Sequence, residues 1–451
     1  MAKYKAYPKY KDSGVEWLDK LPLNWSTEKT KRMFSLKRNL VGHLSSSFQL
    51  LSLTLNGVVP RDISSGEGKI PASFDTYQSV QTGDLIFCLF DIDETPRTIG
   101  LAEQNGMITG AYNVYSCMDK CLPNYAYYYF LHIDSFKGLR PFYTGLRKVV
   151  RAETFGCIEM PYPSLSEQEK ICLFLDHETA KIDNLIEKQQ QLIELLKEKR
   201  QAVISHAVTK GLNPDVPMKD SGVEWLGEVP DHWDVCAIKH IVSTPITDGP
   251  HETPDFIDDG IPFISAEAIS SGVIDFDKKR ACISIRDHKR FSKKYSPQFN
   301  DIYMVKSGAT TGITAIVETY DDFNIWSPLA VIRCNDYSNP YFVINFMRSK
   351  PFQTAIELNW SYGTQQNIGM GVIGNLHIAR PPVREAIDIA TYLRAKCSKF
   401  DELIDIAMMQ ISIMQERRTA LISAAVTGKI DVRDWVAPDM QDVEEPQETT
   451  A

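Results

Sequence analysis

The chain has 451 residues, of which 43% are hydrophobic and 24% charged, and its formal net charge is −9. This length allows two to four domains, and the hydrophobic content is ordinary for globular cores. There is no apolar run of about 18 residues, which argues against a membrane span, and the first residues lack the apolar core of a secretory signal. We therefore expect a cytoplasmic protein whose nine cysteines are reduced thiols.

An internal repeat organises the chain. Residues 11–25, KDSGVEWLDKLPLNW, return at 219–233 as KDSGVEWLGEVPDHW, with eight consecutive residues identical. Residues 164–211 also align with residues 383–429. The protein is therefore predicted to have two homologous halves, each a globular region followed by a long helix. The tryptophans that recur at equivalent places are predicted to be packing residues, and they are Trp17, Trp25, Trp225 and Trp233.

Both globular regions, residues 1–163 and 212–382, have the pattern of mixed α/β structure. Short apolar stretches separated by Gly, Asp and Pro are typical of strands. Strands are predicted at 48–59, 83–90 and 111–118 in the first region, and at 261–269, 301–317 and 326–334 in the second. Helices are predicted near 27–36 and at 125–136 in the first region, and at 341–349 in the second.

The stretches 164–211 and 383–429 each predict a long amphipathic helix. Apolar residues at three- and four-residue spacing form one seam along a helix. The predicted seams are Leu175, Ile182, Leu185, Gln189, Leu192, Leu196 and Val203 in the first helix, and Leu393, Phe400, Leu403, Ala407, Gln410, Met414 and Leu421 in the second. A helix of about 60 Å cannot bury its seam in a small domain. We therefore expect the two helices to pair as an antiparallel coiled coil. Residues 430–451 are predicted to form an acidic, disordered tail.

Several motifs together resemble the specificity subunit of type I restriction–modification systems. They are the repeated SGVEWL segment, GDLIF at 83–87, MVKSGATTG at 304–312, YGTQQN at 362–367, the SEQEK helix start, and the helix ends AVTKG and AVTGK. None is specific alone, but their combination in a doubled chain is. The resemblance implies an α+β fold with two tandem target-recognition domains, each followed by a long helix, with the two helices packed antiparallel. The implied divisions are domain 1 at 1–163, a central helix at 164–211, domain 2 at 212–382, a distal helix at 383–429 and the tail at 430–451.

The resemblance also implies a function and a set of partners. Each domain would recognise half of a bipartite, asymmetric site on double-stranded DNA, and the helix pair would set the gap between the halves. Two modification (methyltransferase) subunits and two restriction (ATP-dependent translocase and nuclease) subunits would assemble around the chain. These partners would carry S-adenosylmethionine, ATP and magnesium. The chain itself would have no catalytic residue, metal or cofactor.

Two polar loops in the second half are candidates for DNA contact. The first is Tyr362, Gly363, Thr364, Gln365, Gln366 and Asn367, whose amides can bond adenine with two hydrogen bonds and whose glycine permits close approach. The second is a glycine turn that carries Lys306, Ser307, Thr310 and Thr311, without the spacing of a nucleotide-binding loop. Ordinary polar turns are the alternative. Lys293 lies in a stretch, 278–294, with eight Lys and Arg residues, which could contact phosphate or form a solvated face.

The first half departs from the family pattern at both loops. CLFDIDETPRTIG replaces the SGAT-type turn, and GLRKVV occupies the place of the GTQQN loop. Arg147, Lys148 and Arg151 are the candidates there, because Arg is the common guanine-binding residue and Lys a phosphate anchor. A surface charge cluster is the alternative. Further basic candidates are Lys37, Arg38 and Arg97.

Two other functions stay open at this stage. One is the recognition part of a fused methyltransferase or nuclease, and the other is a coiled-coil adaptor that does not bind DNA. Asn339-Pro340-Tyr341 partly matches the tetrapeptide of amino-methyltransferases but lacks its second proline. The histidines do not cluster in the pattern of a metal site or a Ser-His-Asp set.

Overall fold

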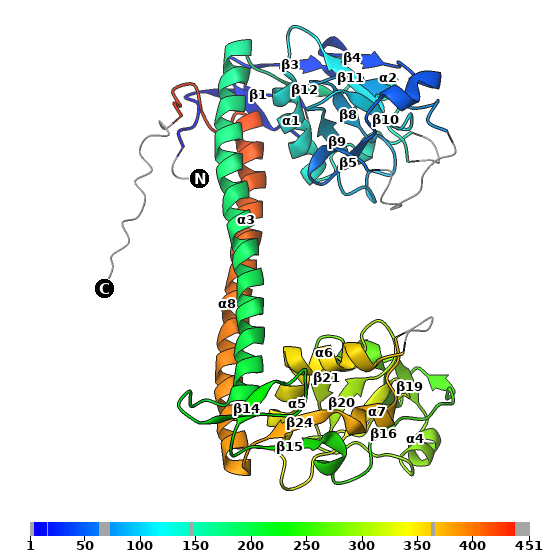
Figure 1. The fold of residues 1–451 in the computed structure, drawn as a ribbon. Coiled ribbons are helices and arrows are strands. Elements are labelled where there is room, and N and C mark those ends of the chain that lie inside the picture. The colour runs from blue at the N-terminus through cyan, green and yellow to red at the C-terminus, as the bar shows by residue number, and fades with distance from the viewer. Residues whose placement is uncertain (1–3, 16, 63–72, 145–147, 362–365, 438–451) are drawn as a thin grey trace. The chain divides into compact units, whose positions relative to one another are not determined.

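The structure is a computed structural model, shown in Figure 1, that describes residues 4–15, 17–62, 73–144, 148–361 and 366–437. All nine cysteines lie within these ranges and are free thiols. None of the helices formed by these residues combines the length and the apolar character needed to cross a membrane.

The chain forms two compact units. Unit 1 consists of residues 1–189 and 409–451, and unit 2 of residues 190–408. The long helices α3 (Leu165–Lys210) and α8 (Val383–Val426) contribute a segment to each unit. This grouping joins helix segments to the globular parts, so the predicted domain boundaries stay a prediction.

Unit 1 is built on a four-stranded antiparallel sheet of order β4-β11-β8-β9. Its strands are β1 (Tyr10–Asp12), β2 (Lys20–Pro22), β3 (Ser26–Lys29), β4 (Phe34–Lys37), β5 (Leu51–Thr54), β6 (Gly57–Pro60), β7 (Gln78–Val80), β8 (Leu85–Phe87), β9 (Ile99–Leu101), β10 (Gly106–Ile108), β11 (Asn113–Cys117) and β12 (Glu159–Tyr162). Its helical elements besides α3 and α8 are η1 (Thr30–Arg32), η2 (Gly42–Ser47), α1 (Pro123–Ser135), η3 (Arg140–Phe142) and α2 (Ala152–Phe155). Phe87 of the sheet packs edge-to-face on Phe130 of α1 and Phe155 of α2, which closes an aromatic core.

Unit 2 repeats this plan with the sheet β16-β23-β20-β21, again antiparallel throughout. Its strands are β13 (Met218–Asp220), β14 (Glu228–Pro230), β15 (Asp234–Ala237), β16 (Thr247–Asp248), β17 (Phe256–Ile257), β18 (Ile261–Ile264), β19 (Ala281–Ile283), β20 (Ile302–Val305), β21 (Thr314–Ile316), β22 (Asn324–Ile325), β23 (Leu329–Ile332) and β24 (His377–Arg380). Its helical elements besides α3 and α8 are η4 (Ile238–His240), η5 (Ala266–Ile269), η6 (Phe276–Lys278), α4 (Ile285–Phe291), α5 (Pro340–Arg348), α6 (Lys350–Asn359) and α7 (Met370–Asn375). A second sheet, β17-β19-β18-β22, has no four-stranded counterpart in the described part of unit 1.

The prediction of a helix near 27–36 is wrong. The segment forms strand β3, the short turn η1 and strand β4. β3 pairs with β12 and β4 pairs with β11. Both partner strands are far away in the sequence, so tertiary pairing overrides the local helical pattern. The other predicted strands and helices contain elements of the predicted type.

The repeated tryptophan segment holds the ends of the long helices in each unit. Trp25 is fully buried, donates its Nε1–H to Glu167 of α3 at 3.2 Å, and packs on Gly428 just after α8. In unit 2, Trp233 is fully buried and packs on Gly211 just after α3. The packing role predicted for these tryptophans is confirmed.

Helices α3 and α8 run antiparallel and side by side within each unit (Figure 1). In unit 1, the beginning of α3 shares a core with the end of α8; in unit 2, the end of α3 shares a core with the beginning of α8. Two ion pairs link the helices, Arg418 with Asp183 in unit 1 and Arg200 with Asp401 in unit 2. Arg418 lies 218 residues after Arg200, and Asp401 lies 218 residues after Asp183. Glu385 and Glu167 have the same separation, so the two ion pairs are equivalent in the repeat. The predicted antiparallel helix pair and α+β class are confirmed.

The predicted seams are wrong by one residue at four positions. Leu185, Leu192, Leu403 and Gln410 are exposed. The neighbouring isoleucines face inward instead, and these are Ile186, Ile193, Ile404 and Ile411. Together with the correctly predicted positions they give a strict seven-residue repeat, which is the period of a left-handed coiled coil.

The disordered tail predicted at 430–451 is wrong for its first part. Ile430 and Val432 are buried, and Trp435 packs edge-to-face on Phe174 of α3 with ring centroids 5.4 Å apart. These side chains bury apolar area that covers the start of α3. Residues 438–451 lie outside the described part of the chain.

Candidate nucleic-acid interface

Unit 2 brings its two predicted contact loops together. The turn after β20 and the loop before α7 form a bridge between Ser307 and Asn367. Gly308 donates its backbone N–H to the carbonyl of Gln366 at 3.0 Å. Thr311 caps the turn by donating its hydroxyl to the Gly308 carbonyl at 2.7 Å. Residues far apart in the sequence therefore present one continuous polar surface.

The side chains of this surface are mostly uncharged. Asn367 is exposed, while Ser307, Thr310 and Gln366 are half-buried. Amide and hydroxyl groups of this kind donate to and accept from base edges in the major groove. Tyr362, Gly363, Thr364 and Gln365 fall outside the described residues.

Lys306 has a structural partner. Its Nζ lies 3.3 Å from the buried carboxylate of Asp248, which also binds Lys294 at 2.5 Å and His251 at 3.1 Å. Burial raises the pKa of the Asp248 carboxyl, but the hydrogen bonds and charges of Lys294 and Lys306 outweigh this and lower the pKa overall. Because the Lys306 side chain is only 14% exposed, its charge mainly stabilises the base of the turn. Sequence reasoning missed Asp248, which carries no motif.

The basic stretch 278–294 spans η6, β19 and α4. Half of its eight cations form ion pairs with nearby carboxylates: Lys278, Arg280, Arg290 and Lys294. Lys293 is exposed two residues after the end of α4 and belongs to the other half, with Lys279, Arg286 and Lys289. These four side chains are available for phosphate oxygens.

Unit 1 contains the same loop pairing with different residues. Phe90 bridges Val149, and Asp91 donates its backbone N–H to the carbonyl of Lys148 at 3.1 Å. These bonds correspond one by one to those of Ser307 with Asn367 and of Gly308 with Gln366. Lys148 therefore occupies the place that Gln366 has in unit 2, which agrees with the predicted equivalence of the two loops.

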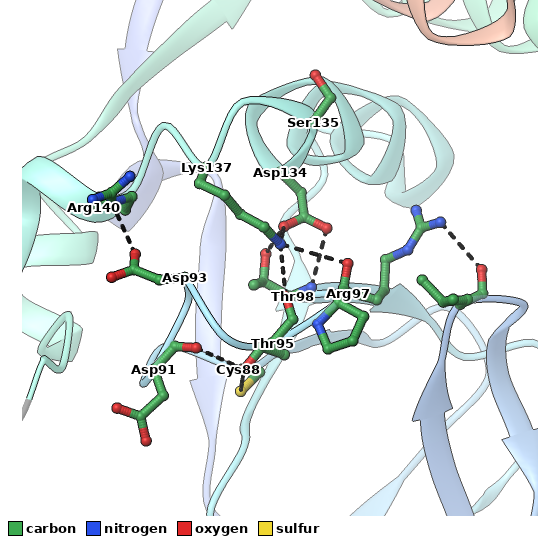
Figure 2. A network of polar contacts seen from close by, with 12 residues as sticks. Cys88, Asp91, Asp93, Thr95, Arg97, Thr98, Asp134, Ser135, Lys137 and Arg140 are labelled. Carbon is green, nitrogen blue, oxygen red and sulfur yellow. Dashed lines mark hydrogen bonds and ion pairs between the residues drawn. The ribbon is translucent and has the colours of Figure 1, made fainter. Parts of the chain in front are cut away.

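Figure 2 shows how the loop between β8 and β9 is held in unit 1. Asp134, at the end of α1, accepts from the backbone N–H of Thr98 at 3.1 Å and from its hydroxyl at 2.7 Å. Lys137 links the Asp134 carboxylate to the carbonyl of Thr95, at 2.8 and 2.7 Å. These hydrogen bonds fix the backbone that leads into β9, so they hold the loop in one conformation.

The unit 1 loop is acidic where its counterpart is neutral. Asp93 binds Arg140 at 2.9 Å (Figure 2). It also accepts a hydrogen bond from the Tyr143 hydroxyl at 3.1 Å. Lys148 lies 3.4 Å from Glu94 and 3.7 Å from Asp93, and the hydrogen bond and charge of Glu94, followed by the charge of Asp93, raise the pKa of Lys148. The charges in CLFDIDETPRT could have signalled this network.

The remaining basic candidates of unit 1 divide into two groups. Lys37 binds Asp84 at 2.7 Å and Arg97 donates to the Leu55 carbonyl at 3.1 Å, so both stabilise the fold. Arg38 and Arg151 are exposed. Arg147 falls outside the described residues. In the described ranges, no group of three or more His, Cys, Asp or Glu is placed to hold a metal ion.

Comparison with known proteins finds a similar sequence and similar folds. No family model matches the sequence. The chain is 24% identical over 295 residues to the Type I restriction enzyme EcoBI specificity subunit from Escherichia coli. It is a homologue of a type I specificity subunit. The match covers 62% of this chain and 60% of the length of that relative. The predicted resemblance is confirmed.

The fold of this specificity-subunit homologue also matches solved structures. It resembles a chain from a structural study of complex assembly and conformational transition of the type I restriction–modification (R-M) system. The TM-score is 0.66 and the sequence identity is 14%. That match covers 91% of this chain and 99% of the other. It resembles the HsdS subunit from Thermoanaerobacter tengcongensis with a TM-score of 0.50, 14% identity, and coverage of 91% and 98%. The fold of this chain is thus similar to the folds of these two solved chains.

Proposed function

We propose that this chain is the DNA-recognition subunit of a type I restriction–modification complex and has no catalytic activity of its own. Each unit would bind one half of a bipartite site on double-stranded DNA. The observation that carries the proposal is the loop pair that the fold builds twice with matching backbone hydrogen bonds. The homology to a specificity subunit supports the same conclusion.

The chemistry of the two loop pairs supports an asymmetric site. In unit 2, Gln366 and Asn367 offer amides, the groups that pair with adenine. In unit 1, Lys148 at the place of Gln366 offers a single cation beside Asp93 and Glu94. A lysine cannot replace an amide as a donor and acceptor pair. The two halves of the DNA site should therefore differ in sequence.

Charge supports a need for partner subunits. The net charge of −9 repels DNA at long range, and only local groups such as Lys279, Lys289 and Lys293 oppose it. The long helices also expose apolar side chains in both units, among them Leu185, Met409 and Ile413 in unit 1 and Leu192, Leu195 and Ile406 in unit 2. Exposed apolar side chains of this size are typical of protein interfaces.

We assign these surfaces to two modification subunits, with two restriction subunits joining the complete cytoplasmic complex. S-adenosylmethionine would bind to the modification subunits, and ATP and magnesium to the restriction subunits. The chain would act by holding each methyltransferase over one half-site.

A gel-shift assay tests the proposal. The chain is mixed with duplex DNA, with and without its modification subunits, at two salt concentrations. Specific, salt-dependent binding is expected only for the assembly, because phosphate contacts release counterions. Binding by neither sample at low salt would contradict the proposal and support the adaptor. DNA methylation or cleavage by the isolated chain would support a fused enzyme.

A further inference from the structure

Unit 2 contains a basic cavity beside the turn that follows β20. Its volume is about 450 Å³, and its lining includes Gly312 of the turn and Thr314 at the start of β21. Its cations are Lys197 and Arg200 of α3 and Arg348 at the end of α5, and Ser270 and Ser271 add hydroxyls. No Asp or Glu is among the described residues that line it. The cavity is therefore suited to an anion.

The two guanidinium groups have donors to spare. Arg348 donates Nη2 to the carbonyls of Gly272 and Thr314, at 2.5 and 3.0 Å, and Nε to the Thr314 hydroxyl at 3.3 Å. Its Nη1 has no hydrogen-bond partner in the described part of the chain. The Nε of Arg200 is shielded from solvent and also lacks one, while its Nη1 lies 3.4 Å from Asp401. Burial and then the charge of Arg200 lower the pKa of Arg348. Arg200 and Arg348 therefore bring two positive charges to one cavity, and each keeps an N–H group without a partner among the described residues.

The repeat shows that the fold does not require this charge. Unit 1 has a cavity of about 500 Å³ between the end of α1 and α8. Gln415 and Thr419, which line it, lie 218 residues after Lys197 and Gln201. His132 stands at the end of α1, where unit 2 has an arginine at the end of α5.

The arginines on the long helices differ in the same way. Arg418, the equivalent of Arg200, does not line the cavity in unit 1. It binds both oxygens of Asp183, at 2.8 and 3.2 Å. The basic set is therefore particular to unit 2, and Arg200 is less completely paired than its counterpart Arg418.

We propose that the cavity in unit 2 binds a free nucleoside phosphate. The planar fork of a guanidinium matches phosphate oxygens with two parallel hydrogen bonds, so Arg200 and Arg348 would hold the phosphates. An adjoining cavity of about 640 Å³ shares both arginines and is also lined by Phe276, Tyr341 and Leu393.

The adjoining cavity has the chemistry of a nucleoside site. Its aromatic and apolar side chains can contact a base. Its carboxylates can accept hydrogen bonds from the hydroxyls of a sugar or the amino group of a base, and they are Glu318, Asp401, Glu402 and Asp405. Both volumes fall within the range of roughly 300–1,000 Å³ that is usual for small-molecule sites.

Isothermal titration of the full chain with ADP tests the proposal. One saturable site per chain is expected, and pyrophosphate should displace ADP at a lower concentration than adenosine does. Arg200→Gln should weaken ADP binding at least about tenfold, the loss of one charge-assisted phosphate contact. Arg418→Gln is the matched control, since it removes the closer helix–helix ion pair but no cavity residue, and its affinity should stay that of the wild type.

Four outcomes would overturn the proposal. ADP could show no saturable site, or both substitutions could weaken ADP binding equally while circular dichroism shows that both variants are folded. ADP could also be displaced by adenosine and not by pyrophosphate, or it could be displaced by duplex DNA. The last outcome would assign the arginines to the DNA backbone.

Discussion

Two adjacent residues of α3 in unit 2 test where the seam of the helix pair lies. Ile193 is 8% exposed and Leu192 is 43% exposed. Truncation of isoleucine to alanine removes three carbon atoms, each worth about 0.8 kcal/mol when buried, and leaves a cavity. We expect Ile193→Ala to lower the free energy of unfolding by about 2–4 kcal/mol. Leu192→Ala should cost about 1 kcal/mol or less, because its side chain already contacts water.

The assay is urea denaturation of the isolated chain, followed by far-UV circular dichroism. The isolated chain is required because a partner subunit could cover Leu192. The pair Ile186→Ala and Leu185→Ala repeats the comparison in unit 1, where Leu185 is 45% exposed. A cost for Leu192→Ala equal to or above that for Ile193→Ala would refute a seam that passes through Ile186 and Ile193.

Three further predictions concern other features of the fold. Gly428→Ala should lower the free energy of unfolding by more than Gly211→Ala, measured in the same urea assay. Both glycines have positive φ, +70° and +76°, but a Cβ at Gly428 would lie 2.5 Å from a proline side chain, whereas at Gly211 the nearest atom is 3.4 Å away. Burial, then a nearby lysine charge, lowers the pKa of His132 from 6.5 to about 4. The unfolded chain therefore binds a proton at His132 more tightly than the folded chain does. The stability that this histidine contributes is fully present above pH 6.5 and is lost as the pH falls toward 4, by about 2 kcal/mol after allowance for partial exposure. His132→Gln should remove this pH dependence of the urea midpoint, and an unchanged dependence would refute the role of His132. A double-mutant cycle of Asp183→Asn and Arg418→Gln should give a coupling of about 0.5 kcal/mol that declines with salt, because the pair is partly exposed; a coupling that is independent of salt would contradict a solvent-screened pair.

The sequence predicted the architecture because the repeat is strong. The identical KDSGVEWL segments and the aligned helices define two halves, and the spacing of apolar residues requires the helices to pair. The seam was displaced because Leu185 and Ile186 are both apolar neighbours. Leu185 with Leu192 and Ile186 with Ile193 both fit a seven-residue repeat, so the spacing cannot choose between them, and only packing against the partner helix decides which residues are buried.

The repeat also located the candidate loops in both units. It placed GLRKVV opposite YGTQQN, and the hydrogen bonds of Lys148 and Gln366 agree with that alignment. The pairing of Lys306 with Asp248 could not be predicted, because it joins loops brought together only by the order of strands in the sheet. The strand β3 was missed for the same reason, since its partner β12 is distant in the sequence.

The central claim is that two equivalent loop pairs recognise two different half-sites. Single-molecule sequencing of methylated DNA tests it most directly, in cells that express this chain with its modification subunit. We predict a split motif, methylated in both halves, that disappears when the chain is deleted. Gln366→Ala should alter one half and Lys148→Ala the other. A continuous motif, or one in which both substitutions alter the same half, would contradict the account.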